Sequence, residues 1–450
     1  MMHIIMKDNI MFINRNEELR LLESEYASAN STFSVIYGRR RVGKTALISK
    51  YIENKPHIYL YATEGNLALQ LENFTKELTK LSDLSYAKNI KFETFDEAFE
   101  FLANLKLSSK LVVAIDEYQN LCRLDNAFSS KLQRVWDLYL SRANIHLILC
   151  GSVFSMMHSE VLAYNAPLYG RRTTNIHLKS VRFRYLTDFV PRLGKLELME
   201  LYASFGTIPK YLQMVDQSKS LLANIEAYIL NKNSYLYSEG MFLLKQEIND
   251  VGSYFAILES ISKGNTKVGD ISSNLGLHSS HLPRYLAKLI ELDIVQKEVP
   301  ITETNPLKSK LGRYRIKDKF LNFWFYYVYK NMSYLELGQT QTVIDEIKMN
   351  FNDRFVSFAY EDYCVEEILQ EPLKYLTFVP KRVGRWWNNQ EEIDIVAMDD
   401  ENICFIECKW QNTVDKTKVE QALKQKSKII KHDKKEYFLV MTKEDYLIPI

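Results

Sequence analysis

Residues 38–46, GRRRVGKTA, have the types and spacing needed to hold a chain of phosphate groups. They match the pattern GxxxxGK[ST], with an apolar run before them and a helical pattern after them, the strand–loop–helix context that this pattern requires. In such a loop, backbone amides approach the anion at a helix N-terminus, Lys44 reaches the outer phosphates, and the Thr45 hydroxyl holds Mg²⁺. The sequence therefore predicts a site for ATP and Mg²⁺ made of Gly38, Arg39, Arg40, Arg41, Val42, Gly43, Lys44, Thr45 and Ala46.

Polar residues at the ends of two further apolar runs complete a site for phosphoryl transfer. KLVVAIDEYQNL is continuously apolar up to Asp116 and Glu117, as is typical of a strand buried on both faces of a parallel sheet. Asp116 suits the support of Mg²⁺, and Glu117 suits the general base that orients the attacking water. NIHLILCGS ends at Ser152, which can sense the terminal phosphate. Arg171 and Arg172 can neutralise charge that develops during transfer. The same sequence is equally consistent with two solvated surface arginines.

A second set of charged residues interrupts apolar strands near the C-terminal end, in IDIVAMDDENICFIECKW. Charged side chains are rarely buried without a partner or a ligand. Alternation along a strand places Glu407 and Lys409 on one face, and pairing with the preceding strand brings Asp394 against them. Such a group fits a hard divalent cation, Mg²⁺ or Mn²⁺, whose bound water can attack a phosphodiester. A retained ion pair without chemistry is the alternative.

Length and composition narrow the class of protein. The chain has 450 residues, 46% of them hydrophobic and 25% charged, enough for about three domains with their own cores. A net charge of +2 gives no overall basic field, so contacts with nucleic acid must come from local patches. The five cysteines form no CxxC pair, and no apolar run reaches the roughly 20 residues of a membrane span. We therefore expect a cytoplasmic protein with buried thiols and no membrane contact.

The middle of the chain has the pattern of a helix-turn-helix followed by a wing. Gly276 suits the tight turn between two helices, and the second helix keeps its leucines on one face. Its other face carries Ser279, Ser280, His281, Arg284 and Lys288. Two strands, at 294–299 and 313–316, would form the wing, which offers Lys308, Lys310 and Arg313. The module either reads DNA with its second helix in the major groove or packs on the rest of the protein, and DNA is the partner we expect.

The order of the N-terminal motifs resembles a known family. FINRNEEL, GRRRVGKT, LVVAIDEYQNL, LILCGS, PLYGRRT and FGTIPKYL follow one another as in the prokaryotic "archaeal ATPase" family, a branch of the AAA+/STAND P-loop ATPases. The resemblance covers roughly the first half of the chain. It implies that residues 12–19, including Phe12 and Arg15, pack by the adenine and that Ser152 is a sensor. It also implies that Pro209 belongs to a lid that touches the nucleotide.

The same resemblance gives the paired arginines a role. It implies that Arg171 or Arg172 acts as an arginine finger, either within the chain or from the neighbouring subunit of a homo-oligomer. The chain departs from the family at Asn14, where relatives often have glycine before the arginine of the first motif. That departure concerns the adenine contact and leaves the phosphate site untouched.

The last hundred residues resemble the PD-(D/E)XK restriction-endonuclease-like fold, and also the C-terminal domain of unknown function often attached to these ATPases. The resemblance makes Asp394 and Glu407 metal ligands, Lys409 the catalytic lysine, and Glu361 on the preceding helix a supporting acid. Between that helix and the acidic strands, YLTFVP is expected as a strand and KRVGRWWNNQEE as a basic, aromatic loop. The proline that precedes the aspartate in the family is Ile393 here. A decayed domain kept for binding or assembly would preserve the same fold.

The predicted fold class is α/β: a P-loop ATPase with a parallel sheet, a helical lid, a winged helix-turn-helix and a C-terminal restriction-endonuclease-like α/β domain. The predicted domains are 1–180 for the ATPase core, 181–245 for the lid, 246–320 for the winged helix, and 321–450 for a buried bridging helix and the nuclease-like domain. The predicted function is an ATP-hydrolysing switch coupled to a metal-dependent nuclease acting on DNA. The alternatives are an ATP-gated DNA-binding or signalling ATPase whose last domain is inactive.

Overall fold

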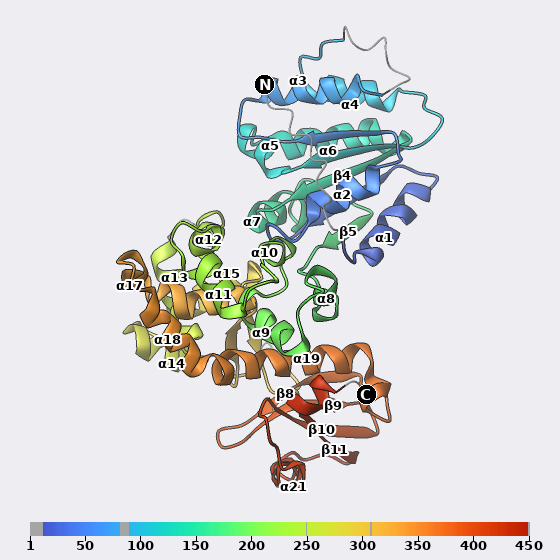
Figure 1. The fold of residues 1–450 in the computed structure, drawn as a ribbon. Coiled ribbons are helices and arrows are strands. Elements are labelled where there is room, and N and C mark those ends of the chain that lie inside the picture. The colour runs from blue at the N-terminus through green and yellow to red at the C-terminus, as the bar shows by residue number, and fades with distance from the viewer. Residues whose placement is uncertain (1–11, 82–89, 249, 307, 449–450) are drawn as a thin grey trace. The chain divides into compact units, whose positions relative to one another are not determined.

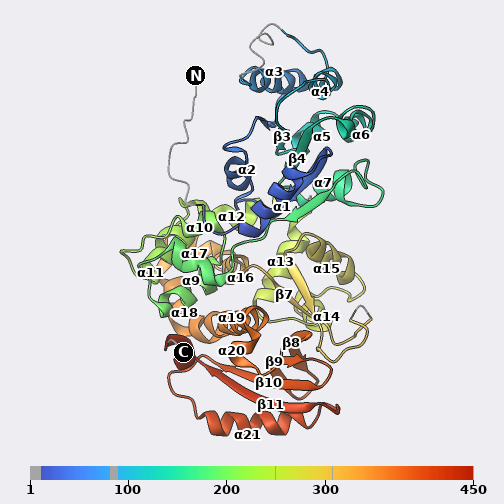
Figure 2. The same cartoon turned by 90° about the vertical axis from the view of Figure 1, so that its right-hand side faces the viewer.

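The computed structural model describes residues 12–81, 90–248, 250–306 and 308–448, which fall into two compact units. The N-terminal unit contains the described residues up to Phe189 together with Ile208–Lys210. The C-terminal unit contains Val190–Thr207 and the described residues from Tyr211 onward. Figures 1 and 2 show the course of the chain through both units. No helix within the described ranges combines the length and the apolar character needed to traverse a lipid bilayer.

The N-terminal unit is built on a five-stranded sheet in which every pairing is parallel. In spatial order the strands are β2 (His57–Tyr61), β3 (Leu111–Asp116), β4 (Ile145–Gly151), β1 (Thr32–Tyr37) and β5 (Thr174–His177). Every residue of β3 and β4 is buried, because helices cover both faces of the sheet. The predicted parallel sheet is therefore confirmed.

Helices form a layer on each face of this sheet (Figure 1). One face packs against α3 (Leu67–Leu78), α4 (Phe95–Ala103) and α6 (Phe128–Leu138), which share a single apolar core with the strands. The other face carries α1 (Asn16–Ala27) and α2 (Lys44–Ile52). The shorter helical segments are α5 (Gln119–Leu124), η2 (Leu140–Arg142), α7 (Phe154–Met157), η3 (His158–Leu162), η4 (Phe183–Tyr185) and α8 (Leu186–Phe189). This layering brings the carboxyl ends of β1, β3 and β4 to one edge, where the phosphate-binding loop lies.

The C-terminal unit begins with helices and a winged helix. The first helices are α9 (Lys195–Phe205), α10 (Pro209–Leu212, shared between the units), α11 (Leu221–Ile225), η5 (Glu226–Leu230) and α12 (Tyr235–Lys245). The winged helix consists of α13 (Val251–Ser262), α14 (Val268–Leu275), α15 (Leu282–Glu291), β6 (Val295–Glu298) and β7 (Arg313–Ile316). Gly276 ends α14 in the left-handed conformation with φ 62°, which glycine adopts without strain. Leu282, Leu286 and Leu289 are fully buried on one face of α15, as their spacing predicts.

A buried aromatic segment connects the winged helix to the last domain. It comprises α16 (Lys319–Phe323) and the π-helical η6 (Trp324–Tyr329), and its aromatic side chains are nearly all buried, as predicted. The chain continues through α17 (Met332–Glu336), α18 (Thr340–Phe351), η7 (Asn352–Val356), α19 (Ser357–Gln370) and α20 (Pro372–Tyr375).

The last domain is a separate four-stranded mixed sheet between two helices. Its strands, in spatial order, are β11 (Lys435–Thr442), β10 (Asn402–Lys409), β9 (Glu392–Met398) and β8 (Arg382–Trp387). Helix α19 covers one face and α21 (Lys416–Ser427) the other, as Figures 1 and 2 both show; α22 (Lys443–Leu447) follows the sheet.

The edge strand of this sheet corrects the sequence prediction. The segment YLTFVP forms no strand, and the expected loop instead forms β8, paired antiparallel with β9 across a bulge between Gly384 and Trp386. The reason is burial: Trp386 and Trp387 are 6% and 3% exposed, and an extended strand places such rings in the core.

Candidate functional site

The phosphate-binding loop lies between β1 and α2, where only glycine fits at two positions. A Cβ atom on Gly38 would lie 2.2 Å from the carbonyl oxygen of Leu178, and Gly43 has φ 99° at the start of α2. Lys44 is 6% exposed, and its Nζ donates hydrogen bonds to the carbonyl oxygens of Gly38 (2.8 Å) and Arg39 (2.9 Å). The ammonium group is therefore already held inside the curve of the loop, where a phosphate chain would bind.

Burial determines the electrostatics of this lysine. Desolvation lowers the pKa of Lys44, and the nearby carboxylates of Glu117 and Asp116 oppose part of that shift. A buried cation that lacks a carboxylate in direct contact has a strong preference for an incoming anion.

Thr45 and Asp116, the two residues predicted to support Mg²⁺, contact each other directly. Thr45 Oγ1 donates to Asp116 Oδ2 at 2.7 Å, and the same oxygen accepts from the Tyr59 hydroxyl at 2.9 Å. Asp116 is 1% exposed, and its other oxygen accepts from the backbone amide of Glu117. A hydroxyl and a fixed carboxylate in contact form a donor set that fits a magnesium ion between the loop and β3. The sequence did not reveal Tyr59, which lies on the neighbouring strand β2.

Glu117 is held by a polar network in an uncommon backbone conformation. Its φ of 54° is left-handed, which is rare for a residue with a side chain and is often found at functional sites. Ser152 Oγ donates to Glu117 Oε2 at 2.7 Å, and Gln119 Nε2 donates to the same oxygen. Arg40 Nε lies 3.4 Å from Ser152 Oγ. The structure thus connects the predicted base, the predicted sensor and the loop, and it adds Gln119, which the sequence did not single out.

Arg15 is hydrogen-bonded to the backbone of the phosphate-binding loop. It is 6% exposed and donates to the carbonyl oxygens of Val42 (3.0 Å) and Lys179 (2.6 Å). Burial lowers its pKa, and the pairing with Glu18 at 3.1 Å counters that effect. Its contacts in this structure are with protein, and they fix the shape of the loop. Phe12, three residues earlier in the chain, is half-buried.

The two arginines predicted as a finger contact protein groups outside the phosphate-binding loop, and the proline predicted in the lid lies on a short helix. Arg171 pairs with Asp137 at 3.0 Å, and Arg172 donates to two backbone carbonyls of η3. Pro209 begins α10. Among the residues that the structure describes, no hydrogen-bond or ion-pair partner of Arg171 or Arg172 belongs to the phosphate-binding loop.

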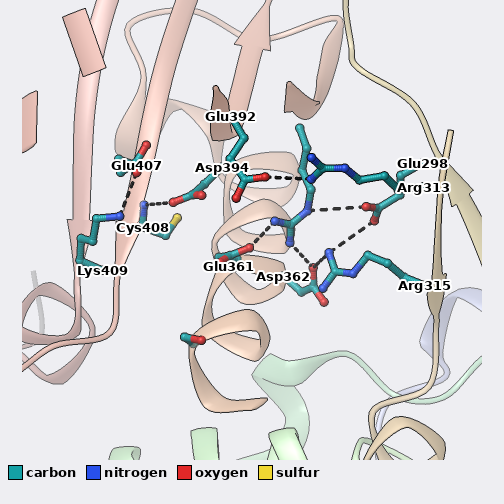
Figure 3. Close-up of polar contacts among 12 residues, drawn as sticks. Glu298, Arg313, Arg315, Glu361, Asp362, Glu392, Asp394, Glu407, Cys408 and Lys409 are labelled. Atoms are coloured by element: carbon teal, nitrogen blue, oxygen red, sulfur yellow. Dashed lines mark hydrogen bonds and ion pairs between the residues drawn. The ribbon is translucent and has the colours of Figure 1, made fainter. Parts of the chain in front are cut away.

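The C-terminal charged residues lie close together but are bound to protein partners (Figure 3). Asp394 Oδ2 accepts from the backbone amide of Cys408 at 2.8 Å. Glu407 Oε1 contacts two ammonium groups, those of Lys409 (2.8 Å) and Lys426 (3.3 Å), while its buried Oε2 has no hydrogen-bond partner among the described residues. Burial, together with the negative charges of Glu361 and Glu407, raises the pKa of Asp394 to about 7.

An arginine that the sequence did not single out binds the fourth residue of this group. Arg385, on β8, forms ion pairs with Glu361 and with Asp362 (3.0 Å), and its Nε lies 3.9 Å from Glu298 of the winged helix. The expected convergence of Glu361, Asp394 and Glu407 on one cation is therefore corrected. Within the described part of the chain, no three His, Cys, Asp or Glu side chains group closely enough to hold a metal ion.

The winged helix exposes most of its predicted reading face but not all of its predicted wing cations. Ser279, Ser280, His281 and Arg284 are exposed, and so are Lys308 and Lys310. Lys288 is half-buried and pairs with Glu291 at 2.9 Å. Arg313, in contrast, pairs with Glu392 at 2.8 Å and lies over the ring of Trp387. The base of the wing is thus attached to the last sheet, which also hydrogen-bonds it through Trp387 Nε1 and the Leu311 carbonyl at 3.1 Å.

Comparisons with protein families agree with this division. The family described as "ATPase domain predominantly from Archaea" matches residues 12–215. "Bacterial regulatory protein, arsR family" matches residues 255–297, the helix-turn-helix. "Archaea bacterial proteins of unknown function" matches residues 324–422. The resemblance to the archaeal ATPases and the helix-turn-helix are confirmed.

Relatives and solved structures extend the likeness over the chain. It is similar to "Uncharacterized protein MJECL04" of Methanocaldococcus jannaschii, with 36% identity over 441 residues and 96% of each chain covered. A 46-residue stretch is 52% identical to "Uncharacterized ATP-binding protein MJ0423" of the same organism, covering 10% of this chain and 78% of that protein. In structure it is similar to "The walker-type atpase paby2304 of pyrococcus abyssi", with a TM-score of 0.52, 20% identity, and coverage of 70% and 96%. That last likeness is one of fold.

Proposed function

Because the chain belongs to the family of archaeal-type ATPases that join a P-loop ATPase domain to a C-terminal domain of unknown function, we propose that it hydrolyses ATP as a switch that controls DNA binding by its winged helix. One observation carries the catalytic part of this proposal. Thr45 donates a hydrogen bond to Asp116, and Ser152 donates one to Glu117. The pair that would support the metal ion and the pair of base and sensor therefore lie next to each other at the carboxyl edge of the sheet.

The residues of the loop would each perform one task. Lys44 would exchange the two loop carbonyls for phosphate oxygens, and Thr45 with Asp116 would hold Mg²⁺. When bound, Mg²⁺ neutralises charge on the outer phosphates. Glu117 would orient a water, and Ser152 would respond to loss of the terminal phosphate.

Replacing Glu117 with glutamine tests this assignment. We expect hydrolysis of ATP to fall at least about 100-fold while ATP still binds, because glutamine keeps the hydrogen bonds but cannot accept the proton of the water. Turnover is measured by phosphate release and binding by calorimetry. Glu100→Gln, an exposed change on α4, is the matched control. Full turnover in Glu117→Gln would remove Glu117 from the reaction.

Arg171 or Arg172 completes the proposal as an arginine finger, in cis or across a homo-oligomer. Either arginine would first have to leave its present partners, Asp137 or the carbonyls of η3.

The winged helix is proposed to bind DNA through α15. On this helix the exposed guanidinium of Arg284 lies 4.7 Å from the ring of Tyr285 and donates to its hydroxyl at 2.8 Å. The guanidinium is held by its neighbour at an exposed position, where a phosphate can reach it.

Arg284→Ala should weaken DNA binding and lower the slope of log affinity against log salt by about 1, the value for one lost phosphate contact. Fluorescence anisotropy with duplex DNA at several salt concentrations measures both quantities. Lys219→Ala, at a lysine that is 53% exposed, should leave the slope unchanged. Equal slopes for Arg284→Ala and wild type would exclude α15 from the interface.

Metal-dependent cleavage of DNA by a restriction-endonuclease-like last domain is a second candidate function. The observation in its favour is the buried, unpartnered Oε2 of Glu407 beside Asp394 and Lys409. These two carboxylates could bind Mg²⁺ or Mn²⁺, and Glu361 could join them only if Arg385 released it. A bound cation would supply an activated water, and Lys409 would offset charge at the scissile phosphate.

Cleavage assays with Mg²⁺ and Mn²⁺ test this second function. We expect strand cutting that is lost in Glu407→Ala and in Lys409→Ala but retained in Glu420→Ala, a change at an exposed residue of α21. Cutting that persists in the first two variants belongs to a contaminant. If wild type does not cut at all, the last domain serves binding or assembly.

A further inference from the structure

A pocket of 360 Å³ lies within the C-terminal unit, between the winged helix and the last sheet. Its walls come from α9, α13, β6, β7, α16, η7, α19, β8 and β9. None of its lining residues belongs to the phosphate-binding loop. The acids that line it are Glu298, Glu392 and Asp394. Figure 3 shows Arg313 and Arg315 beside the carboxylates of Glu392, Glu298 and Asp362.

Three arginines of the pocket have hydrogen-bonding capacity left over. Arg313 and Arg354 each have a buried Nε atom without a partner among the described residues. Arg313 uses Nη1 for Glu392, and Arg354 uses Nη2 for the carbonyl of Ser262 at 3.0 Å. Arg315 lies 3.6 and 3.9 Å from its nearest carboxylate oxygens, too far for a hydrogen bond. Buried donors without acceptors are costly, and an anionic ligand would satisfy them.

The other two cations of the pocket, Lys319 and Arg385, form ion pairs with carboxylates of α19. Lys319 and Arg385 both pair with Asp362, and Arg385 also pairs with Glu361. Of the three arginines, Arg313 pairs with Glu392, and Arg315 lies within ion-pair distance of Glu298 and Asp362. Arg354 has no carboxylate partner among the described residues, so its charge is the one left for a ligand.

An apolar wall lies beside the arginines. Phe358 is 44% exposed, and the guanidinium of Arg315 lies 5.4 Å from its ring. Trp386 and Ile261 line the pocket as well. An exposed ring next to a guanidinium is a stacking surface for a planar aromatic group.

We propose that this pocket binds a nucleoside phosphate, with the phosphate on Arg313, Arg315 and Arg354 and the base against Phe358. The planar guanidinium group of arginine matches the geometry of phosphate oxygens. The base of the nucleotide would contact the apolar wall, whereas a simple anion would make no contact with it. The volume lies at the lower end of the range of about 300–1,000 Å³ for small-ligand sites, so one nucleotide is the size expected. The ligand is either a free nucleotide or one unpaired nucleotide of a DNA strand, since both present the same groups.

The test uses the full chain carrying Lys44→Ala, which disables the phosphate-binding loop, so the outcome is independent of the proposed ATP hydrolysis. Calorimetry is performed with AMP, with inorganic phosphate and with a short single-stranded oligothymidylate. We expect saturable binding of AMP or the oligonucleotide, weakened at least about tenfold by Arg354→Ala, which removes a charge-assisted contact. Phe358→Ala should weaken it as well, and because this ring is exposed the variant keeps the fold, which thermal unfolding confirms. Lys348→Ala, at a lysine 56% exposed on α18, is the control.

The ligands separate the two sources. AMP binding that depends on Arg354 and Phe358 identifies a free nucleotide, and binding of the oligonucleotide alone with the same dependence identifies a strand. The proposal is overturned if neither binds, if binding is indifferent to both substitutions, or if inorganic phosphate binds as tightly as AMP.

Discussion

Replacing Lys44 with alanine is expected to lower ATP turnover at least about 100-fold and to weaken ATP binding, because the loop loses its only ammonium group for the outer phosphates. The structure shows how the ammonium group of Lys44 is positioned. Nζ is held by the carbonyls of Gly38 and Arg39, and alanine has no group that reaches them. Phosphate release and calorimetry measure the two effects.

Lys50→Ala is the matched control for this experiment. Lys50 lies on the same helix, is 51% exposed and pairs with Glu53 at 2.8 Å, so its removal tests loss of a lysine without touching the loop. Turnover in Lys44→Ala equal to that in Lys50→Ala would end the assignment of the loop to ATP hydrolysis.

Replacing Asp362 with asparagine is expected to destabilise the C-terminal unit by about 3 kcal/mol, the lower end of the range for breaking a buried ion pair. The Asp362 carboxylate pairs with Lys319, Arg315 and Arg385, and its side chain is 29% exposed, so water offsets part of the loss. Asparagine keeps the size but leaves three cations facing one another. Urea unfolding followed by tryptophan fluorescence reports this unit, since four of the five tryptophans belong to it.

The pH dependence of this effect has a defined sign. Burial acts to raise the pKa of Asp362, but Lys319, Arg315 and Arg385 outweigh it and hold the pKa well below the ordinary value. A lowered folded-state pKa contributes stability above the unfolded pKa of about 3.9 and loses it as pH falls further toward the folded-state value. Wild type and Asp362→Asn should therefore differ most near pH 7 and converge below about pH 4.

Asp353→Asn provides the comparison for both measurements, because Asp353 is an exposed carboxylate of η7 in the same unit. Its unfolding curve should overlay that of wild type. A stability of Asp362→Asn that also matched wild type would show that the cations around it are not held by this carboxylate.

The phosphate-binding loop could be predicted from the sequence almost residue by residue. Its strand, glycines, lysine and helix are contiguous, and their geometry depends on local backbone preferences that the residue types set. The same holds for the buried strand before Asp116 and for the leucine face of α15, where spacing alone decides which side is covered.

The partners of the long charged side chains could not be predicted in this way. Glu361 was expected to meet a cation with Asp394, yet Arg385, 24 residues away, takes it. Arg313 was expected to face DNA, yet it pairs with Glu392, 79 residues away. The segment containing Arg385 was predicted to be a loop, but it forms β8. The position of this strand in the sheet determines which residues its side chains contact, and no local sequence pattern specifies that position.

The sequence by itself determined that this protein has a phosphate-binding loop on a parallel sheet, a helix-turn-helix, and a strand pair with buried charges. The tertiary structure decided which charges meet. Backbone geometry within a loop is set over a few residues, whereas an arginine or a glutamate has several acceptable partners, and packing between distant strands and helices selects among them. That selection ties the wing to the last sheet and creates the arginine-lined pocket between them.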